Sequence, residues 1–211
     1  RPEKIGGWTK YTETSFLGVC RSVHAWASLE AVKYIGLGTN LKFYVVEGVK
    51  PNDITPLRAS TSAGDVTFSA STGSSTITVT DTSHGASQND FVTFSGAASL
   101  GANITAAGLN QEYQISAIST ANAYTVTAKD TNGDTVTADS GDSGNGGSSV
   151  VGAYQITSGL NTYVSAVGWG SDPWGEGTWG SGTALGVSGQ LRLYSQDNFG
   201  EDLIFNVRNG G

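Results

Sequence analysis

The stretch that decides the fold reads Tyr34-Ile35-Gly36-Leu37-Gly38-Thr39-Asn40, followed directly by Leu41-Lys42-Phe43-Tyr44-Val45-Val46. Each half is a short run of apolar residues, and the Gly, Thr and Asn between them favour a tight turn. A third short run follows at residues 53–57, and most of residues 1–31 are expected to be extended. The pattern predicts an antiparallel meander, the unit from which propeller blades and sandwiches are built.

The composition of the whole chain points the same way. The 211 residues include 30 Gly and only 14% charged residues, and Ser, Thr and Val dominate the middle. Residues branched at Cβ fit the pleated surface of a sheet, and Gly serves tight turns. The composition therefore predicts an all-β protein.

A change in composition predicts two parts. From residue 60 the aromatic residues thin out, and five alternating runs follow at 66–68, 76–79, 91–94, 113–116 and 124–127. Their period of two predicts strands with one apolar face, in a small β-barrel or sandwich. We therefore predict an inserted Ser/Thr-rich module at 60–157, and a discontinuous meander scaffold, partly propeller-like or sandwich-like, formed by 1–59 and 158–211.

Charge and hydropathy exclude two classes of function. The net charge is −7 and no Lys/Arg cluster occurs, so we expect no direct recognition of nucleic acid. The longest apolar runs fall far short of the roughly 20 residues that span a bilayer, so no membrane span is expected. The single Cys20 excludes an internal disulfide, and its apolar surroundings predict a small core residue. Because the chain starts at Arg1, it is expected to be processed or a fragment.

One motif imitates a catalytic site. Gly141-Asp142-Ser143-Gly144 copies the letters around a trypsin-like serine nucleophile, with His24 as the imaginable base. Nucleophilic catalysis needs a rigidly held nucleophile and base, whereas residues 141–147 are Gly-rich and predict a flexible loop. Nothing singles out a carboxylate pair for glycoside hydrolysis. We predict that the protein is not an enzyme.

One motif imitates a calcium site, and the two histidines are the candidates for zinc ligands. Asp130-Thr131-Asn132-Gly133-Asp134 spaces its oxygen ligands as a calcium loop does, but Thr135 and Gly141 stand where Gly and a bidentate carboxylate are needed. Weak calcium binding by Asp130, Asp134 and Asp139 stays open beside a plain turn, for which Asn132-Gly133 is a strong signal. His24 and His84 lack partners at the spacing of zinc ligands. We predict no metal and no cofactor.

The remaining candidate for recognition is a Trp-rich segment. Trp169, Trp174 and Trp179 recur every five residues on a Gly background. Such rings can stack on sugars, bury themselves in a subunit interface, or pack within their own chain. We favour packing within the chain, followed by the interface and then the sugar.

The resemblance to a known family rests on short motifs that are spread over the chain. On the flanks they are residues 1–8, residues 34–42, Asp53-Ile54-Thr55-Pro56-Leu57-Arg58 and Asn198-Phe199-Gly200-Glu201-Asp202-Leu203-Ile204. These resemble virion structural proteins of tailed bacteriophages, above all the propeller-like nozzle proteins of short-tailed phages. In the insert, His84-Gly85, Asp90-Phe91-Val92, Gly96, Leu109-Asn110, Tyr113-Gln114-Ile115 and Tyr124-Thr125 resemble the FCCH module of ubiquitin-activating enzymes, which lacks catalytic machinery.

The resemblance implies a function in assembly. It implies a tail component that joins copies of itself and other virion proteins, is located in the virion, and is assembled in the cytoplasm of the bacterial host. Family members would continue past Gly211, which again indicates a fragment. The alternative is a surface adhesin or carbohydrate-binding module that uses Trp169, Trp174 and Trp179 on a host-surface glycan.

Overall fold

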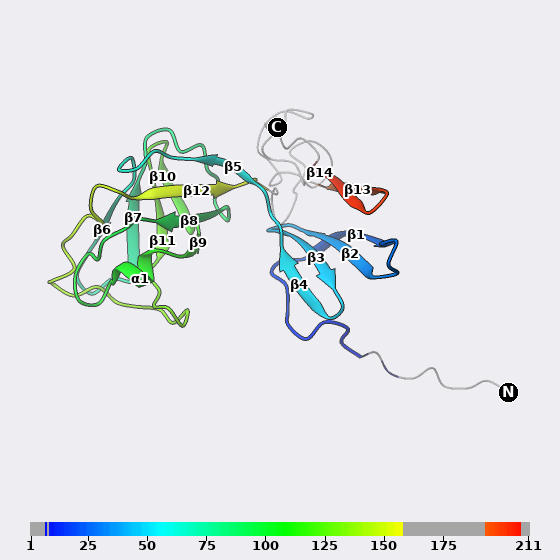
Figure 1. Cartoon of the computed structure of the whole chain (residues 1–211). Coiled ribbons are helices and arrows are strands. Elements are labelled where there is room, and N and C mark those ends of the chain that lie inside the picture. The colour runs from blue at the N-terminus through cyan, green and yellow to red at the C-terminus, as the bar shows by residue number, and fades with distance from the viewer. Residues whose placement is uncertain (1–6, 8, 158–192, 208–211) are drawn as a thin grey trace, which may run out of the picture. The chain divides into compact units, whose positions relative to one another are not determined.

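The computed structural model describes residue 7, residues 9–157 and residues 193–207. The chain forms two compact units (Figure 1): Arg1–Thr55 with Ser158–Gly211, called the scaffold here, and Pro56–Thr157, called the module. All the strand pairs in both units are antiparallel and the described helix is a single turn, so the predicted all-β class is confirmed. Each unit is described by itself below.

The scaffold contains a four-stranded sheet whose strands follow one another in chain order. The strands are β1 (Cys20–Ala27), β2 (Lys33–Thr39), β3 (Phe43–Glu47) and β4 (Lys50–Asp53). This is the predicted meander, and it has the strand order of one propeller blade. The strand predicted at 53–57 is wrong. Gly48, with a φ of +60°, turns the chain so tightly that Glu47 already pairs with Lys50.

Side chains fix the turn between β2 and β3. The hydroxyl oxygen of Thr39 accepts hydrogen bonds from the backbone N–H groups of Leu41 and Lys42, at 3.1 and 2.8 Å. The side-chain oxygen of Asn40 accepts one from the N–H of Val19 at 2.6 Å. Short polar side chains that bond to nearby backbone stabilise turns in this way. The Thr-Asn pair thus closes the turn and also holds the chain that leads into β1.

A partly buried ion pair joins the residue before β3 to the end of β4. The ammonium group of Lys42 lies 2.5 Å from Asp53 Oδ2, and only 2% of the Lys42 side chain is exposed. Thr55 donates to the same carboxylate through its N–H and its hydroxyl. Burial acts to raise the pKa of Asp53, but the hydrogen bonds from Lys42 and Thr55 prevail and lower it. The charged form of Asp53 therefore stabilises the scaffold.

A hairpin from the far end of the chain packs on this sheet. Its strands are β13 (Tyr194–Phe199) and β14 (Asp202–Val207). The ring of Phe43 stacks on Phe205 with 3.9 Å between centroids, and it also touches the ring of Tyr194. The amide of Gln196 donates to the hydroxyl of Ser22 at 2.5 Å. Residues before and after the module therefore form one unit.

Two glycines of β2 make room for the hairpin. A Cβ atom on Gly38 would overlap the ring of Tyr194, and one on Gly36 would overlap the amide of Gln196. Both glycines have ordinary strand conformations, so the close approach of the hairpin explains their presence. The Gly-Leu-Gly of residues 36–38 is therefore a packing feature as well as part of the strand.

The module consists of two four-stranded sheets with the strand orders β10-β11-β7-β6 and β5-β12-β8-β9. Its elements are β5 (Leu57–Ser60), β6 (Thr67–Ala70), β7 (Thr76–Thr80), β8 (Phe91–Ser95), α1 (Ala106–Leu109), β9 (Glu112–Gln114), β10 (Ala117–Thr120), β11 (Ala123–Thr127) and β12 (Val151–Gln155). Because β5 pairs with β12, the module starts at Pro56, whereas the composition placed its start at residue 60.

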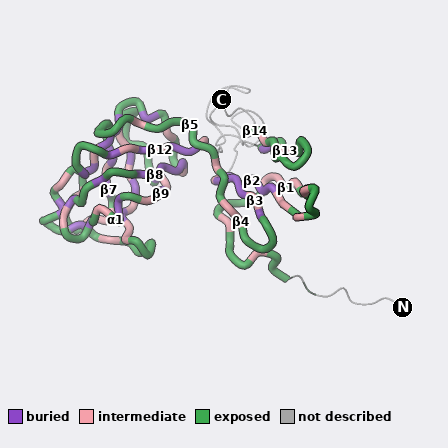
Figure 2. The backbone as a smooth tube through the Cα atoms, viewed as in Figure 1, coloured by how far each residue is buried: buried purple, intermediate pink, exposed green. Residues whose placement is uncertain are grey.

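The two sheets of the module share one apolar core, as in a sandwich. Ile77 and Val79 of β7 alternate with less buried residues, as the period of two predicts. The ring of Phe68 in one sheet meets that of Phe94 in the other edge-on, with 5.0 Å between centroids. Figure 2 shows buried residues recurring along the strands of the module. This core makes the module a folding unit in its own right.

A polar chain crosses the core of the module. The hydroxyl of Tyr154 donates to the buried Asp81 at 2.5 Å and lies 2.8 Å from the hydroxyl of Tyr124. A phenol has one proton, so Tyr124 is the donor to Tyr154. Burial raises the pKa of both tyrosines, which stay protonated. The chain joins β11 and β12 of the two sheets at a buried polar contact.

Candidate functional site

Large apolar side chains are exposed mainly on the scaffold. Ten of the twelve in the described part of the chain belong to it: Tyr11, Leu17, Val19, Val23, Leu29, Val49, Ile54, Leu193, Phe199 and Ile204. The other two are Leu57 and Ile118 of the module. Within the described residues, exposed large apolar side chains are therefore concentrated on the scaffold.

Two turns of the scaffold present the most exposed of these side chains. Leu29, in the turn between β1 and β2, is 93% exposed, and Phe199, at the tip of the β13–β14 hairpin, is 78% exposed. Glu201 ties the turns together. Its carboxylate accepts a hydrogen bond from the N–H of Leu29 at 2.5 Å, and its backbone carbonyl accepts one from Trp26 Nε1 at 3.1 Å. We call this pair of turns the apolar tip.

Aromatic rings support the apolar tip from the sheet. The ring of Trp26 lies between those of His24 and Tyr34, with centroids 5.9 and 5.4 Å away. Nε2 of His24 is 3.1 Å from the side-chain oxygen of Asn198, next to Phe199 in the hairpin. His24, imagined above as a catalytic base, therefore joins β1 to the hairpin.

The Asp of the serine motif has a structural role in the module. Ser143 is exposed, but its neighbour Asp142 is buried and accepts hydrogen bonds from the N–H groups of Asn103, Ile104 and Asp139. Burial acts to raise the pKa of Asp142, and these N–H groups prevail and lower it. The loop predicted to be flexible is thus anchored by a buried carboxylate, and the prediction of its flexibility is wrong.

The acidic motif forms a turn. The carboxylate of Asp130 accepts hydrogen bonds from the N–H groups of Asn132 and Asp134, both at 2.9 Å, and Gly133 has a φ of +89°. The turn signal of Asn132-Gly133 is confirmed. Asp139 caps the following turn through the N–H of Gly141. In residues 9–157 and 193–207, no three His, Cys, Asp or Glu side chains are gathered as a metal site.

The second histidine and the cysteine are both accounted for locally. In His84, Nδ1 accepts from the N–H of Ala86 and Nε2 donates to the carbonyl of Thr120, so both ring nitrogens hold a loop. Cys20 is exposed, so the prediction that it is a core residue is wrong: the apolar run before it lies along the surface. Its partial burial raises the pKa of the thiol, which disfavours the reactive thiolate.

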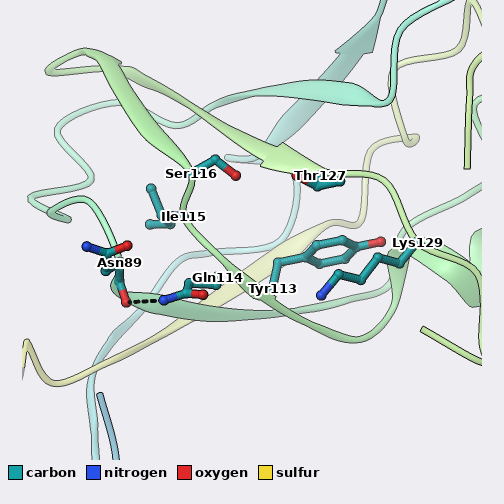
Figure 3. A pocket seen from close by; sticks show the side chains of 7 residues that line it. All are labelled: Asn89, Tyr113, Gln114, Ile115, Ser116, Thr127 and Lys129. Carbon is teal, nitrogen blue, oxygen red and sulfur yellow. Dashed lines mark hydrogen bonds between the residues drawn. The ribbon is translucent and has the colours of Figure 1, made fainter. Parts of the chain in front are cut away.

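Trp169, Trp174 and Trp179 lie outside the described residues, so their three alternatives stay predictions. Local sequence patterns do not indicate the apolar tip, because its two turns are far apart in the chain. Nor do they indicate a hollow in the module, which is lined by Asn89, Tyr113 and Lys129 among others (Figure 3).

Among the described residues, no helix is both long and apolar enough to cross a membrane.

Comparison with known proteins adds a distant likeness. The chain matches no protein-family model, and no curated protein sequence matches it. Among solved structures, it is similar to the endosialidase of phage phi92, with 19% identity and a TM-score of 0.31. The match covers 65% of this chain and 17% of the endosialidase chain. A likeness at this level assigns neither a fold nor an activity.

Proposed function

We propose that this chain is a structural component of a bacteriophage tail and acts by assembly, without catalysis. The motifs that resemble phage virion proteins supply the first support. Two of those on the flanks, residues 34–42 and 198–204, meet in the folded scaffold, where Gly36 faces Leu203. They are residues that hold the scaffold together, as expected of a protein whose function is its shape.

The apolar tip is the observation that carries the proposal. Burying a Leu or Phe side chain contributes about 1.5–3 kcal/mol, and Leu29 and Phe199 forgo most of this in the isolated chain. Glu201 holds the backbone of the Leu29 turn against the hairpin that carries Phe199, so the two turns need not be brought together when a partner covers them. Preorganised apolar anchors of this kind are typical of the centre of a protein interface.

The partners proposed for this surface are further copies of the chain and other virion proteins. The net charge of −7 opposes adhesion to DNA, which suits a component of a conduit through which DNA passes. The protein would be located in the virion after assembly in the cytoplasm of the bacterial host. The module, with its own core, would be carried by the scaffold as an insertion, which costs little closure entropy.

Sedimentation velocity over a wide concentration range tests the proposal. We expect the full chain to associate as its concentration rises, and the double variant Leu29→Ser with Phe199→Ser to stay monomeric. Leu57→Ser is the matched control, because Leu57 is an exposed leucine of the module, and it should associate like the wild type. A wild-type chain that stays monomeric throughout, or a double variant that associates equally well, would refute assembly through the apolar tip.

A further inference from the structure

A polar hollow lies at the corner of the module where the chain leaves β9 and enters β10 (Figure 3). It has a volume of about 140 Å³. Its lining residues come from three segments: Asn89, Tyr113, Gln114, Ile115, Ser116, Thr127 and Lys129. An engineered cavity of about 150 Å³ holds one benzene molecule, so this hollow has room for one six-membered ring.

The lining has an apolar floor and polar walls. Tyr113 and Ile115 are buried at the floor, and the Tyr113 hydroxyl donates to the carbonyl of Gly108 at 2.5 Å. Its ring therefore meets the hollow while its polar end is engaged elsewhere. The half-buried Gln114 and Thr127 supply an amide and a hydroxyl to the walls. A few polar groups around an apolar surface are the usual pattern of a small-molecule site.

A turn residue contributes an amide to the rim. Asn89 has a φ of +73°, in the left-handed region that Asn adopts more readily than most residues other than Gly. Its carbonyl accepts a hydrogen bond from Gln114 Nε2 at 3.4 Å, the dashed line in Figure 3. The turn therefore places the amide side chain of Asn89 at the edge of the hollow.

The hollow contains one of the few cations of an acidic module. The module has eight acidic residues and only two basic ones, Arg58 and Lys129. Arg58 is engaged, because it donates to the carbonyl of His84 and lies over the ring of Tyr154. Lys129 forms no ion pair with any described residue, and its ammonium end points toward Gln114 in Figure 3. The free cation of the module is thus directed into its hollow.

We propose that this hollow binds one carboxylate-bearing sugar ring. Lys129 would take the carboxylate, and Asn89, Gln114 and Thr127 would hydrogen-bond to the hydroxyls. The less polar face of the ring would lie toward Tyr113. This ligand requires no assembly of the scaffold, so it stands or falls separately from the function proposed above.

Titration of the isotope-labelled full chain with glucuronate, followed by amide chemical shifts, tests the proposal. Glucose is the matched neutral sugar, and acetate is the matched simple anion. We expect glucuronate to shift the amides of residues 113–116 and 127–129 in a saturable way, and the other two probes to bind at least about tenfold more weakly, since each lacks half of the contacts. If glucose bound as tightly as glucuronate, Lys129 would have no role in recognition. If acetate bound as tightly as glucuronate, the hollow would be a site for simple anions.

Variants assign the binding to the hollow. Lys129→Gln should weaken glucuronate binding by about tenfold or more, the usual effect of losing a charge-assisted hydrogen bond. Thr127→Val, which keeps the shape of the side chain, should weaken it by a smaller factor. Lys50→Gln removes an exposed lysine of the scaffold and should leave binding unchanged. Absence of saturable shifts in the wild type, or unchanged affinity in Lys129→Gln, would overturn the proposal.

Discussion

Replacing Gly38 by Ala tests how the two ends of the chain are joined. The new Cβ atom would overlap the ring of Tyr194 and lie about one ångström too close to the hydroxyl of Ser22, as judged from ordinary packing distances. Tyr194 is only 7% exposed and touches the buried Phe43, so it has little room to move. The change would therefore push the β13–β14 hairpin away from the sheet.

Two opposing effects set the magnitude. In a strand, Ala is favoured over Gly by about 0.5–1 kcal/mol, because Gly loses more conformational entropy on folding. An extra methyl group in a tightly packed site costs about 1–3 kcal/mol. The steric cost should prevail, and the scaffold should lose about 1–2 kcal/mol of unfolding free energy. With a slope of about 1–3 kcal/mol per molar, the urea midpoint should fall by roughly 1 M.

Tryptophan fluorescence measures this change selectively. All the tryptophans of the chain, Trp8, Trp26, Trp169, Trp174 and Trp179, lie outside residues 56–157 and therefore report on the scaffold. Urea unfolding followed at this signal should show the lower midpoint in Gly38→Ala. Far-UV circular dichroism, to which both units contribute, should reveal a module transition that does not move.

Gly152→Ala is the matched control. Gly152 lies in β12 of the module, and its added Cβ would meet Val66 at 3.4 Å, an ordinary contact distance. This variant should leave the fluorescence midpoint unchanged. If Gly38→Ala raised that midpoint or left it unaltered, the hairpin would not be held by the close packing that we describe.

Two further changes probe polar contacts. The Asp53 carboxylate has a lowered pKa, so its contribution to stability is present above the usual Asp value of about 3.9 and is lost as the pH falls through the folded value. Asp53→Asn should therefore reduce the acid-induced fall of the fluorescence midpoint, and an unchanged fall would contradict the role of its pair with Lys42. Tyr154→Phe should destabilise the module by about 2–3 kcal/mol, because Asp81 and Tyr124 both lose their partner, whereas Tyr124→Phe should cost only about 1 kcal/mol. Circular dichroism compares the two tyrosine variants, and equal losses would contradict the central position of Tyr154 between Asp81 and Tyr124.

Strands with one buried face could be predicted from the sequence. Ile77 and Val79 alternate with polar residues, and this local pattern places β7 almost to the residue. Strands β5 and β10 could not be found in this way, because all their residues are exposed and no apolar alternation marks them. Pairing with a neighbouring strand, which is a tertiary property, defines both.

Tertiary anchors also explain the wrong prediction for the loop at 141–147. Its Gly-rich composition is typical of a flexible chain. The buried carboxylate of Asp142 accepts a hydrogen bond from the N–H of Asn103, 39 positions away, and the N–H of Gly144 donates to the carbonyl of Leu100. Contacts with distant segments therefore anchor the loop. The composition of a segment indicates which conformations the segment prefers in isolation, and it carries no information about such contacts.

The candidate sites were missed for the same reason. Leu29 and Glu201 are 172 positions apart, and no local pattern connects them. The hollow likewise draws Asn89, Gln114 and Lys129 from separate segments of the module. The distribution of charge in the sequence does single out Lys129, since it is one of only two basic residues between positions 56 and 157.

The most direct test of the central claim is to identify a phage whose genome encodes this chain and to measure the protein composition of its purified virions. Quantitative mass spectrometry, with immunogold labelling for position, measures whether the chain is part of the particle. The account predicts a fixed stoichiometry relative to the other tail proteins and labelling on the tail. If the chain is absent from purified particles and remains in the soluble lysate, the proposal of a structural tail component is contradicted.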